Sequence, residues 1–518
     1  MGPSANFPCF CTFLLLTIVQ CYAAKIAVVL FPNGVSHYFM IEKVGNVLES
    51  RGHEVTYVMC SMDPIIVGAK VNKLIYDTPY PSDHLIKDSA IVALKKGFLD
   101  TSDIGRFIIL LRNICDSLLL DEGLLSKLRG YDLVFADNSF SGCGQLVQRK
   151  VGIPFIVDFS AWGLNYDVFN FHYGIPWPVS YIPDDFIPSS TQMSFLQRVS
   201  NLLLFGFTRL MGSYFSHFGV SSLKHRHNIA PEKSFTQLIQ ETDLLLMPLD
   251  WALEWSRPLP PNVKMIGSTN QRPAEKLPQD LEDFMQSAGK EGVVLVSFGS
   301  MVGELNERQV EILVKAFSQL KYKVLWKYNR NFSHVENIKT VAWLPQNDIL
   351  GHPHLRLFVT HGGANSVQEA AYHAVPLLIT PLWGDQFSNA QKIQAAGMGS
   401  SMDIRVNAEY TAENIVELIN ELIENSKYKT NALRVSKLMK DRSRTSSQEG
   451  ADWIEYVLRN NGTRHLLPRG TSLPFYQYFL LDVVLFLLVV VVLVVYILMG
   501  FCKCLKKICS KAEKEKIQ

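Results

Sequence analysis

Residues 483–502 form a run of twenty residues without a charged side chain. A helix of this length spans the roughly 30 Å hydrocarbon layer of a bilayer. Tyr476 and Tyr478 precede the run and lysines follow it from Lys503 onward, an arrangement typical of membrane spans with a cytosolic basic flank. The sequence therefore predicts one C-terminal transmembrane helix, residues 483–502, and a cytosolic basic tail, residues 503–518, with the body of the chain on the other side of the membrane.

The N-terminal end carries a second targeting signal. Residues 10–19 are a short apolar run followed by the small-residue stretch Cys21-Tyr-Ala-Ala24, a pattern that predicts a secretory signal peptide over residues 1–24. No Lys or Arg stands before Lys25, so a buried first strand behind a frayed leader is the alternative. A signal peptide agrees with a body that lies outside the cytosol.

The last residues indicate which membrane holds the chain. Lys514 and Lys516 stand fifth and third from the end, a spacing that resembles the dilysine retrieval signal of endoplasmic reticulum membrane proteins. We therefore expect a single-pass protein of that membrane with its body in the lumen, and an ordinary solvated lysine tail is the alternative. Two sequons, at Asn331 and Asn461, would then be open to glycosylation.

Composition limits what the body can be. With 518 residues, 48% of them hydrophobic and 19% charged, the chain is long and apolar enough for two packed domains. A net charge of +2 gives no electrostatic reason to expect nucleic acid binding. Cys60, Cys115 and Cys143 fall in the presumed lumenal body, and this odd number predicts no disulfide framework.

The body alternates between apolar runs and helical patterns. Residues 25–31 are a continuous apolar run, a helical pattern follows to Ser50, and a second run covers residues 55–59, which together indicate a βαβ unit of a parallel sheet. A second set of such units begins at Val293. The segment between the two sets, residues 267–290, opens with many Pro, Asn, Gln and charged residues and is predicted to be a linker.

We therefore predict an α/β protein with two doubly wound, Rossmann-like domains, residues 25–266 and 291–465. Ligands of such folds bind at the carboxyl edges of the strands, so the two sheets should face each other across a cleft that holds the site.

Residues 343–386 carry a dense set of glycine and polar residues that one family explains. The segment contains Trp343-Leu-Pro-Gln346, His361-Gly-Gly-Ala-Asn365-Ser366, Glu369 and Gly384-Asp385-Gln386. It resembles the donor-binding signature of the UDP-glycosyltransferases, the superfamily that includes the glucuronosyltransferases, and the resemblance extends over nearly the whole chain. The resemblance implies the two-domain GT-B fold, in agreement with the strand pattern, and a UDP-sugar as donor substrate.

The chemistry of a nucleotide-sugar site accounts for these residue types. Glycines after the strand that ends at Thr360 let the backbone approach a pyrophosphate, and the N-terminus of the following helix attracts the same anion. In the family the counterpart of Trp343 stacks on uracil, a carboxylate such as Glu369 can accept the ribose hydroxyls, and Asp385 and Gln386 match residues that bind the sugar. The structural alternatives are that Trp343 belongs to the core and that Asn365 caps a helix. The resemblance implies a donor site made of Ser300, Trp343, Gln346, His361, Gly363, Asn365, Ser366, Glu369, Asp385 and Gln386.

The resemblance also implies a catalytic pair in the first domain. His37 follows the first predicted strand and matches the family's base, which takes the proton from the acceptor hydroxyl and suits neutral pH. Asp137, at the end of a strand that runs from Leu133, matches the carboxylate that orients this base. Because the chain has one residue more than its relatives between Asp137 and Cys143, Asn138 is the alternative partner.

The implied reaction is a direct displacement at the anomeric carbon, with inversion, without a covalent intermediate and with no cofactor or obligatory metal. The acceptor is expected to be small and lipophilic, and the resemblance allows for a homo-oligomer. Residues 228–234 and 253–258 resemble the ceramide galactosyltransferase branch and its neighbouring neutral-sugar branch, and no Lys or Arg lies between Lys233 and Arg257. We therefore expect a neutral sugar; glucuronic acid is the alternative donor, and a catalytically silent binding partner is the alternative class.

Residues 195–215 fit the α/β pattern poorly. They read as a helix that is apolar nearly all round and includes Arg198 and Arg209, which excludes a membrane span. The segment lies in the membrane interface, lines the acceptor entrance, or is a buried connecting helix, and the sequence leaves these alternatives open.

Overall fold

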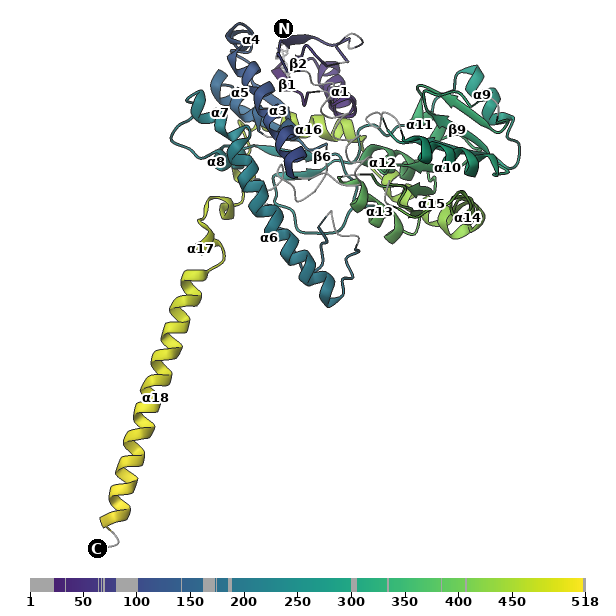
Figure 1. Ribbon diagram of the computed structural model, residues 1–518. Coiled ribbons are helices and arrows are strands. Elements are labelled where there is room, and N and C mark those ends of the chain that lie inside the picture. The colour runs from purple at the N-terminus through teal and green to yellow at the C-terminus, as the bar shows by residue number, and fades with distance from the viewer. Residues whose placement is uncertain are drawn as a thin grey trace, which may run out of the picture.

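The apolar runs of the sequence pair into two separate parallel sheets, each covered by helices on both faces (Figure 1). The structure is a computed structural model of the chain. It describes all residues except 1–22, 33, 64, 67, 69, 81–100, 141, 162–172, 174, 185–188, 300–304, 333–334, 383, 406–407 and 516–518.

The bounds of the elements are as follows. The first sheet contains β1 (Lys25–Val29), β2 (Glu54–Cys60), β3 (Lys73–Tyr76), β4 (Leu133–Asp137), β5 (Phe155–Phe159), β6 (Leu244–Met247) and β7 (Val263–Met265). The helices along this part are α1 (Val35–Ser50), α3 (Thr101–Leu120), α4 (Glu122–Lys127), η1 (Asn138–Phe140), α5 (Cys143–Val151), α6 (Phe195–Phe218), α7 (Ser221–Arg226) and α8 (Phe235–Gln240).

The second sheet contains β8 (Val293–Ser297), β9 (Lys323–Lys327), β10 (Ile338–Val341), β11 (Leu355–Thr360), β12 (Leu377–Ile379) and β13 (Gly399–Ser401). Its helices are α9 (Gln279–Gln286), α10 (Glu307–Ser318), α11 (Gln346–Leu350), α12 (Ala364–Tyr372), α13 (Gln386–Ala395), α14 (Ala412–Glu424) and α15 (Ser426–Lys440). The chain ends with α16 (Ser446–Arg459), η3 (Arg464–Leu466), η4 (Arg469–Ser472), α17 (Phe475–Tyr478) and α18 (Leu481–Glu515).

The first sheet has the strand order β3-β2-β1-β4-β5-β6-β7. Successive residues of β1 serve opposite faces: Ile26 and Val28 pack with α1 and α16, whereas Ala27 and Val29 pack with α3, α4 and α5. Burial on both faces explains why the strands are continuous apolar runs rather than alternating ones. Because β1 and β4 are parallel neighbours, their carboxyl ends meet at one edge of the sheet.

Helix α16 belongs to the first sheet although it follows the second domain in the sequence. Its residues Ala451, Ile454 and Val457 are fully buried in the apolar cluster that contains α1 and one face of β1. Gly450 lies against Val44 of α1. The second domain was expected to cover residues 291–465. Helix α16 lies within this range but belongs to the first domain, because it buries its apolar face there.

The second sheet has the order β10-β9-β8-β11-β12-β13. Helices α10 and α14 pack on one face, and α11, α12, α13 and α15 pack on the other. Helix α9 lies inside the predicted linker, residues 267–290, but its Leu281 and Met285 are buried in the core of the second domain. The connecting segment is therefore shorter than the sequence indicated.

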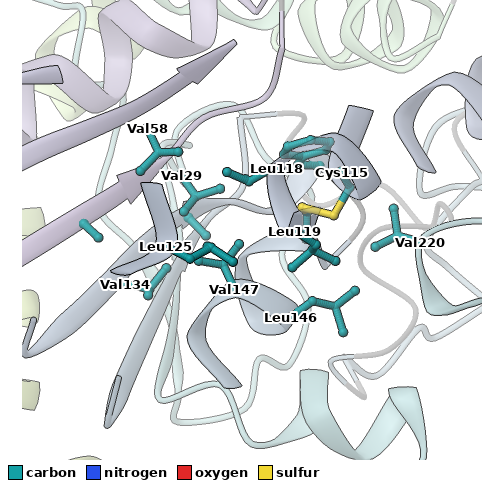
Figure 2. Packing of buried hydrophobic residues seen from close by; sticks show 14 of the residues in the cluster. Val29, Val58, Cys115, Leu118, Leu119, Leu125, Val134, Leu146, Val147 and Val220 are labelled. Atoms are coloured by element: carbon teal, nitrogen blue, oxygen red, sulfur yellow. A yellow bond between two sulfur atoms is a disulfide. The ribbon is translucent and has the colours of Figure 1, made fainter. Parts of the chain in front are cut away.

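Cys115 of α3 and Cys143, the first residue of α5, form a disulfide. Figure 2 shows it among buried residues that include Leu118, Leu146 and Val220. The expectation that the odd cysteine number leaves no disulfide framework is therefore wrong: Cys60 is the free, buried cysteine. The disulfide ties α3 to the segment that follows β4.

Helix α18 leaves the α/β body as a single long rod (Figure 1). Residues Leu481–Lys507 form a candidate membrane span of 27 residues; an 18-residue window within it has a mean hydropathy of 3.3, and none of that window is buried. The span contains the predicted transmembrane residues 483–502 and begins two residues earlier. Its exposed apolar surface is what a helix surrounded by lipid requires.

Candidate active site

His37 and Asp137 are 100 residues apart in the sequence, yet Nδ1 of His37 and Oδ2 of Asp137 are 2.7 Å apart. Asp137 is the last residue of β4, and His37 lies in the first turn of α1, which follows the neighbouring strand β1. The parallel pairing of β1 with β4 brings both residues to the same sheet edge. Asp137, and not the alternative Asn138, therefore contacts the His37 ring.

The surroundings fix the orientation of this pair. The Asp137 side chain is fully buried, and its Oδ1 atom accepts the backbone N–H of Ser139 at 3.0 Å. The ring of Phe31 stacks on the His37 ring with 5.4 Å between centroids. Because a carboxylate only accepts hydrogen bonds, Nδ1 of His37 carries the proton and Nε2 is the basic nitrogen.

A second buried carboxyl group lies on the next strand. Asp158 of β5 is fully buried and accepts hydrogen bonds from Gln145 and Tyr173. Burial raises its pKa to about 7, with the charge of Asp137 adding to this effect. The sequence analysis missed Asp158, because a lone Asp in an apolar strand gives no signal of the partners that surround it.

The second domain presents the N-terminus of α12 to the same region. Gly362 has φ 88°, a conformation that favours glycine, and the N-cap residue is Gly363, which has no side chain to occupy the first amides of the helix. Asn365 lies inside the helix, so it is not the cap. Backbone N–H groups at this helix end are suited to an anion such as a diphosphate.

The ring of His361, which precedes α12 in the sequence, is packed in space between Gly299 and Gly363. A Cβ atom on Gly299 would stand 2.8 Å from the His361 ring, and one on Gly363 would stand 2.7 Å from it, so both positions must lack a side chain for the ring to keep its place. Burial lowers the pKa of His361 to about 4, and the positive charge of Lys327 adds to this effect. The imidazole is therefore neutral at neutral pH.

Gln346 and Glu369 form a polar pair deeper in the site. Nε2 of Gln346 donates to Oε2 of Glu369 at 2.6 Å and to Oγ of Ser366 at 3.2 Å. Burial raises the pKa of Glu369 to about 7, although the hydrogen bond from Gln346 opposes the shift. A ligand that donates hydroxyl groups to Glu369 would favour its ionised form.

Trp343 is 63% exposed, so it does not belong to the core, and its ring is open to stacking. Nζ of Lys327, the last residue of β9, lies 4.6 Å from the centre of this ring, and burial lowers the pKa of Lys327. The sequence analysis did not select Lys327. A lysine that closes an apolar strand at the carboxyl edge of a sheet was the signal that could have found it.

Asp385 and Gln386 stand at the start of α13. Oδ2 of Asp385 accepts a hydrogen bond from Asn389 at 2.8 Å, and Oε1 of Gln386 accepts the backbone N–H of Leu382 at 2.8 Å. Both side chains are therefore held by their own domain.

One cavity of about 440 Å³ between the domains collects the predicted residues. Asp137 stands behind His37 and does not line it, and Ser300 lies outside the described residues. The predicted residues that line the cavity are His37, Trp343, Gln346, His361, Gly363, Asn365, Ser366, Glu369, Asp385 and Gln386. Its wall also contains Lys43, Arg272 and Lys327, so cations would face an anion bound there.

A buried ion cluster joins the domains behind α13. Oε2 of Glu254, in the loop after β6, lies 2.7 Å from Nζ of Lys392 on α13, and its Oε1 accepts from Arg257 at 3.1 Å. The Glu254 side chain is only 2% exposed, and despite its burial the two cations hold the pKa of its carboxyl below the usual value. The cluster ties the helix that begins with Gln386 to the first domain.

The paired α/β domains and the cation-lined cavity between them are the architecture of a GT-B glycosyltransferase, and the likeness to solved structures bears this out. The glycotransferase of kitacinnamycin aligns with a TM-score of 0.59 and 18% identity, covering 84% of this chain and 99% of that one. The calicheamicin glycosyltransferase CalG4 aligns with a TM-score of 0.54 and 17% identity, covering 85% and 99%.

The sequence identifies the family within this class. The family model described as "UDP-glucoronosyl and UDP-glucosyl transferase" matches residues 26–516. UDP-glucuronosyltransferase 2C1 of Oryctolagus cuniculus is 31% identical over 502 residues, 93% of this chain and 98% of that protein. UDP-glucuronosyltransferase 1A8 of Homo sapiens is 33% identical over 523 residues, 96% and 95% of the two chains. The chain belongs to this family and is a UDP-sugar-dependent glycosyltransferase.

The raised pKa of Glu369 predicts a pH dependence of UDP binding. Below pH 7 the carboxyl is largely protonated in the free protein and accepts hydroxyl hydrogen bonds poorly. Ionisation favours binding, so the affinity for UDP should rise about tenfold from pH 6 to pH 8. Isothermal titration calorimetry of the wild type and of Glu369→Gln measures this. Titration of UDP itself changes its affinity for both proteins equally, so the UDP affinity of Glu369→Gln should rise less steeply with pH than that of the wild type. If the two affinities change in parallel with pH, Glu369 is not the group that titrates.

The buried ion cluster predicts that Lys392→Met strongly lowers the free energy of unfolding. Removal of Lys392 leaves the buried Glu254 carboxylate with Arg257 alone, which should lower the free energy of unfolding by roughly 3 kcal/mol and weaken UDP-sugar binding through a misplaced α13. Lys315→Met is the matched control, because Lys315 also stands 2.7 Å from a carboxylate, that of Glu413, but is 62% exposed. Lys315→Met should lower the free energy of unfolding by less than about 1 kcal/mol. Equal shifts of the two variants in thermal unfolding would refute the prediction.

Proposed function

We propose that the protein transfers a hexosyl group from a UDP-sugar to a hydroxyl of a small lipophilic acceptor, with His37 as the base. Support comes from one observation above all: His37, which is hydrogen-bonded to Asp137, lines the same cavity as the residues at the N-terminus of α12. A base and a diphosphate site must share one space if an acceptor is to attack the anomeric carbon.

The proposed step is a single displacement. Nε2 of His37 takes the proton of the acceptor hydroxyl while the oxygen bonds to the anomeric carbon, and the bond from that carbon to the diphosphate oxygen breaks with its electron pair leaving on UDP. Asp137 keeps Nδ1 protonated and stabilises the imidazolium that forms. The N-terminus of α12 and Lys327 would meet the charge that develops on UDP. An α-linked donor would thus give a β-glycoside, and we propose no metal or cofactor in this step.

We propose a neutral sugar as the donor group. Support comes from the absence of Lys and Arg between Lys233 and Arg257 in the sequence. The names of the relatives, UDP-glucuronosyltransferases, favour glucuronic acid as the second candidate. The donor therefore has to be measured.

We further propose that the protein resides in the endoplasmic reticulum membrane, with the signal peptide removed and the body in the lumen. Support comes from the apolar span of α18, from the residues 1–24 that resemble a signal peptide, and from Lys514 and Lys516 near the end.

A donor screen on microsomes that contain the wild type or His37→Ala tests the proposal. UDP-glucose, UDP-galactose, UDP-xylose, UDP-N-acetylglucosamine and UDP-glucuronic acid are each offered with pooled lipid and phenolic acceptors. We expect transfer from a neutral donor that persists in EDTA and is lost in His37→Ala, while UDP binding is retained because His37 does not belong to the donor helix. Transfer that survives in His37→Ala would remove the base assignment, and transfer from UDP-glucuronic acid alone would replace the sugar assignment.

A further inference from the structure

We propose that Tyr173 is a positioning residue for the catalytic pair, a role that rests on the proposed function. Its hydroxyl joins the side chain of Asn138 to the buried carboxyl group of Asp158. This bridge holds the turn that follows β4 and thereby keeps the Asp137 carboxylate aimed at His37. Tyr173 does not line the cavity between the domains, so it acts through Asp137 and not on a substrate.

The turn after β4 supplies one of the two hydrogen bonds that orient Asp137. Its Oδ2 atom meets the His37 ring at 2.7 Å, and its Oδ1 atom accepts the backbone N–H of Ser139 at 3.0 Å. Ser139 belongs to η1, a 3-10 turn of only three residues. Because so short a turn has few hydrogen bonds of its own, side-chain contacts have to fix its backbone. If the Ser139 N–H moved, the carboxylate could rotate away from His37.

Asn138, the first residue of η1, is the point at which Tyr173 holds this turn. Asn138 is buried, and its side chain forms a hydrogen bond with the Tyr173 hydroxyl. The same hydroxyl donates its proton to Oδ2 of Asp158, so its oxygen accepts from the amide of Asn138. Burial raises the pKa of Tyr173 well above its usual value, so the hydroxyl keeps the proton that the bridge needs.

The other end of the bridge is fixed by β5, α5 and the segment before β6. Besides the Tyr173 hydroxyl, Oδ2 of Asp158 accepts hydrogen bonds from Gln145 of α5 and, at 3.4 Å, from Thr242. Asp158, Gln145 and Thr242 are all buried. The ring of Tyr173 packs in the apolar cluster that contains Ile239 of α8. The hydroxyl that holds Asn138 is therefore itself attached to the core of the first domain.

The strand register shows why the bridge has to pass through the turn. Ala136 pairs with Asp158, and Asp137 pairs with Phe159. The side chains of Asp137 and Asp158 therefore leave the sheet on opposite faces, and a direct hydrogen bond between the two carboxyl groups is excluded. Asn138 comes one residue beyond the strand, and from there its side chain reaches the face on which Asp158 lies.

Folding stability alone gives no reason for a carboxyl group at position 158. Among the residues that the structure describes, Oδ1 of Asp158 has no hydrogen-bond partner, and burial raises the pKa of the carboxyl group to about 7. An apolar side chain in β5 would avoid this desolvation. The hydrogen bonds that Asp158 accepts, that of Tyr173 among them, therefore account for its presence.

Turnover of Tyr173→Phe in the full-length membrane protein tests the positioning role. The substitution removes only the hydroxyl of the bridge. We expect kcat to fall about tenfold or more, because a small misplacement of a catalytic group slows a reaction strongly, while the affinity for UDP stays within a few-fold of the wild type. Tyr131→Phe is the matched control: the buried Tyr131 hydroxyl donates to Thr56 at 3.0 Å, at the other end of β4 from Asp137, and its loss should leave kcat unchanged. Equal kcat values in the two variants would overturn the proposal.

Asn138→Ala breaks the same bridge from its other side, so the test does not depend on the folding of one variant. Because both substitutions remove one shared interaction, the double variant with Tyr173→Phe should have the kcat of the slower single variant. Losses of kcat that multiply in the double variant would show two independent effects and would overturn the bridge.

Hydrogen exchange of the full-length protein without substrates separates the positioning role from the proposed function. The peptide that contains Ser139 should exchange several-fold faster in Tyr173→Phe than in the wild type or in Tyr131→Phe, because the Ser139 amide loses its fixed acceptor. Unchanged exchange would overturn the positioning role even if the protein transfers a sugar. A donor screen without any transfer would instead remove the proposed function, while faster exchange would still show that Tyr173 fixes the turn.

Discussion

The hydrogen bond between His37 and Asp137 sets a requirement that the rest of the molecule meets. Its two residues can meet only if β1 and β4 are adjacent and parallel and end at the same level, and the register Val29↔Ala136 provides this. The core packing of both sheet faces keeps that register, since a shift of one residue would exchange the faces of every side chain. The disulfide from α3 to Cys143 holds the segment that follows Asp137.

The proposed function sets a second requirement, that a base on one domain acts on a sugar held by the other. The domains are joined at several points: Gln368 of α12 donates to the carbonyl oxygen of Pro248 at 2.7 Å, and Arg442 pairs with Asp250 at 2.9 Å. The buried Glu254–Lys392 pair attaches α13 to the same loop of the first domain. Helices α12 and α13 are therefore both bonded to the segment between β6 and β7, which would set the distance from a bound donor to His37.

The sequence predicted those parts of the structure that depend on local pattern. The parallel sheets follow from continuous apolar runs. The predicted residues from Trp343 to Gln386, which line one cavity, stand close together in the chain and carry a recognisable chemistry. Lys327, Asp158 and the Glu254–Lys392 pair were not predicted, because their meaning depends on partners far away in the sequence. The return of α16 to the first domain and the pairing of Cys115 with Cys143 have the same cause: an apolar helix face and an odd cysteine count do not specify a distant partner.

The central claim is that Asp137 makes His37 the base of a single displacement, and turnover of Asp137→Asn in the full-length membrane protein tests it most directly. The substitution keeps the size of the side chain but removes the negative charge that orients the imidazole and stabilises its protonated form. The account predicts that kcat falls by orders of magnitude while the affinity for UDP stays within a few-fold of the wild type, since Asp137 does not line the donor cavity. A variant that keeps near wild-type kcat would contradict it, because the base would then not depend on the carboxylate that lies 2.7 Å from its ring.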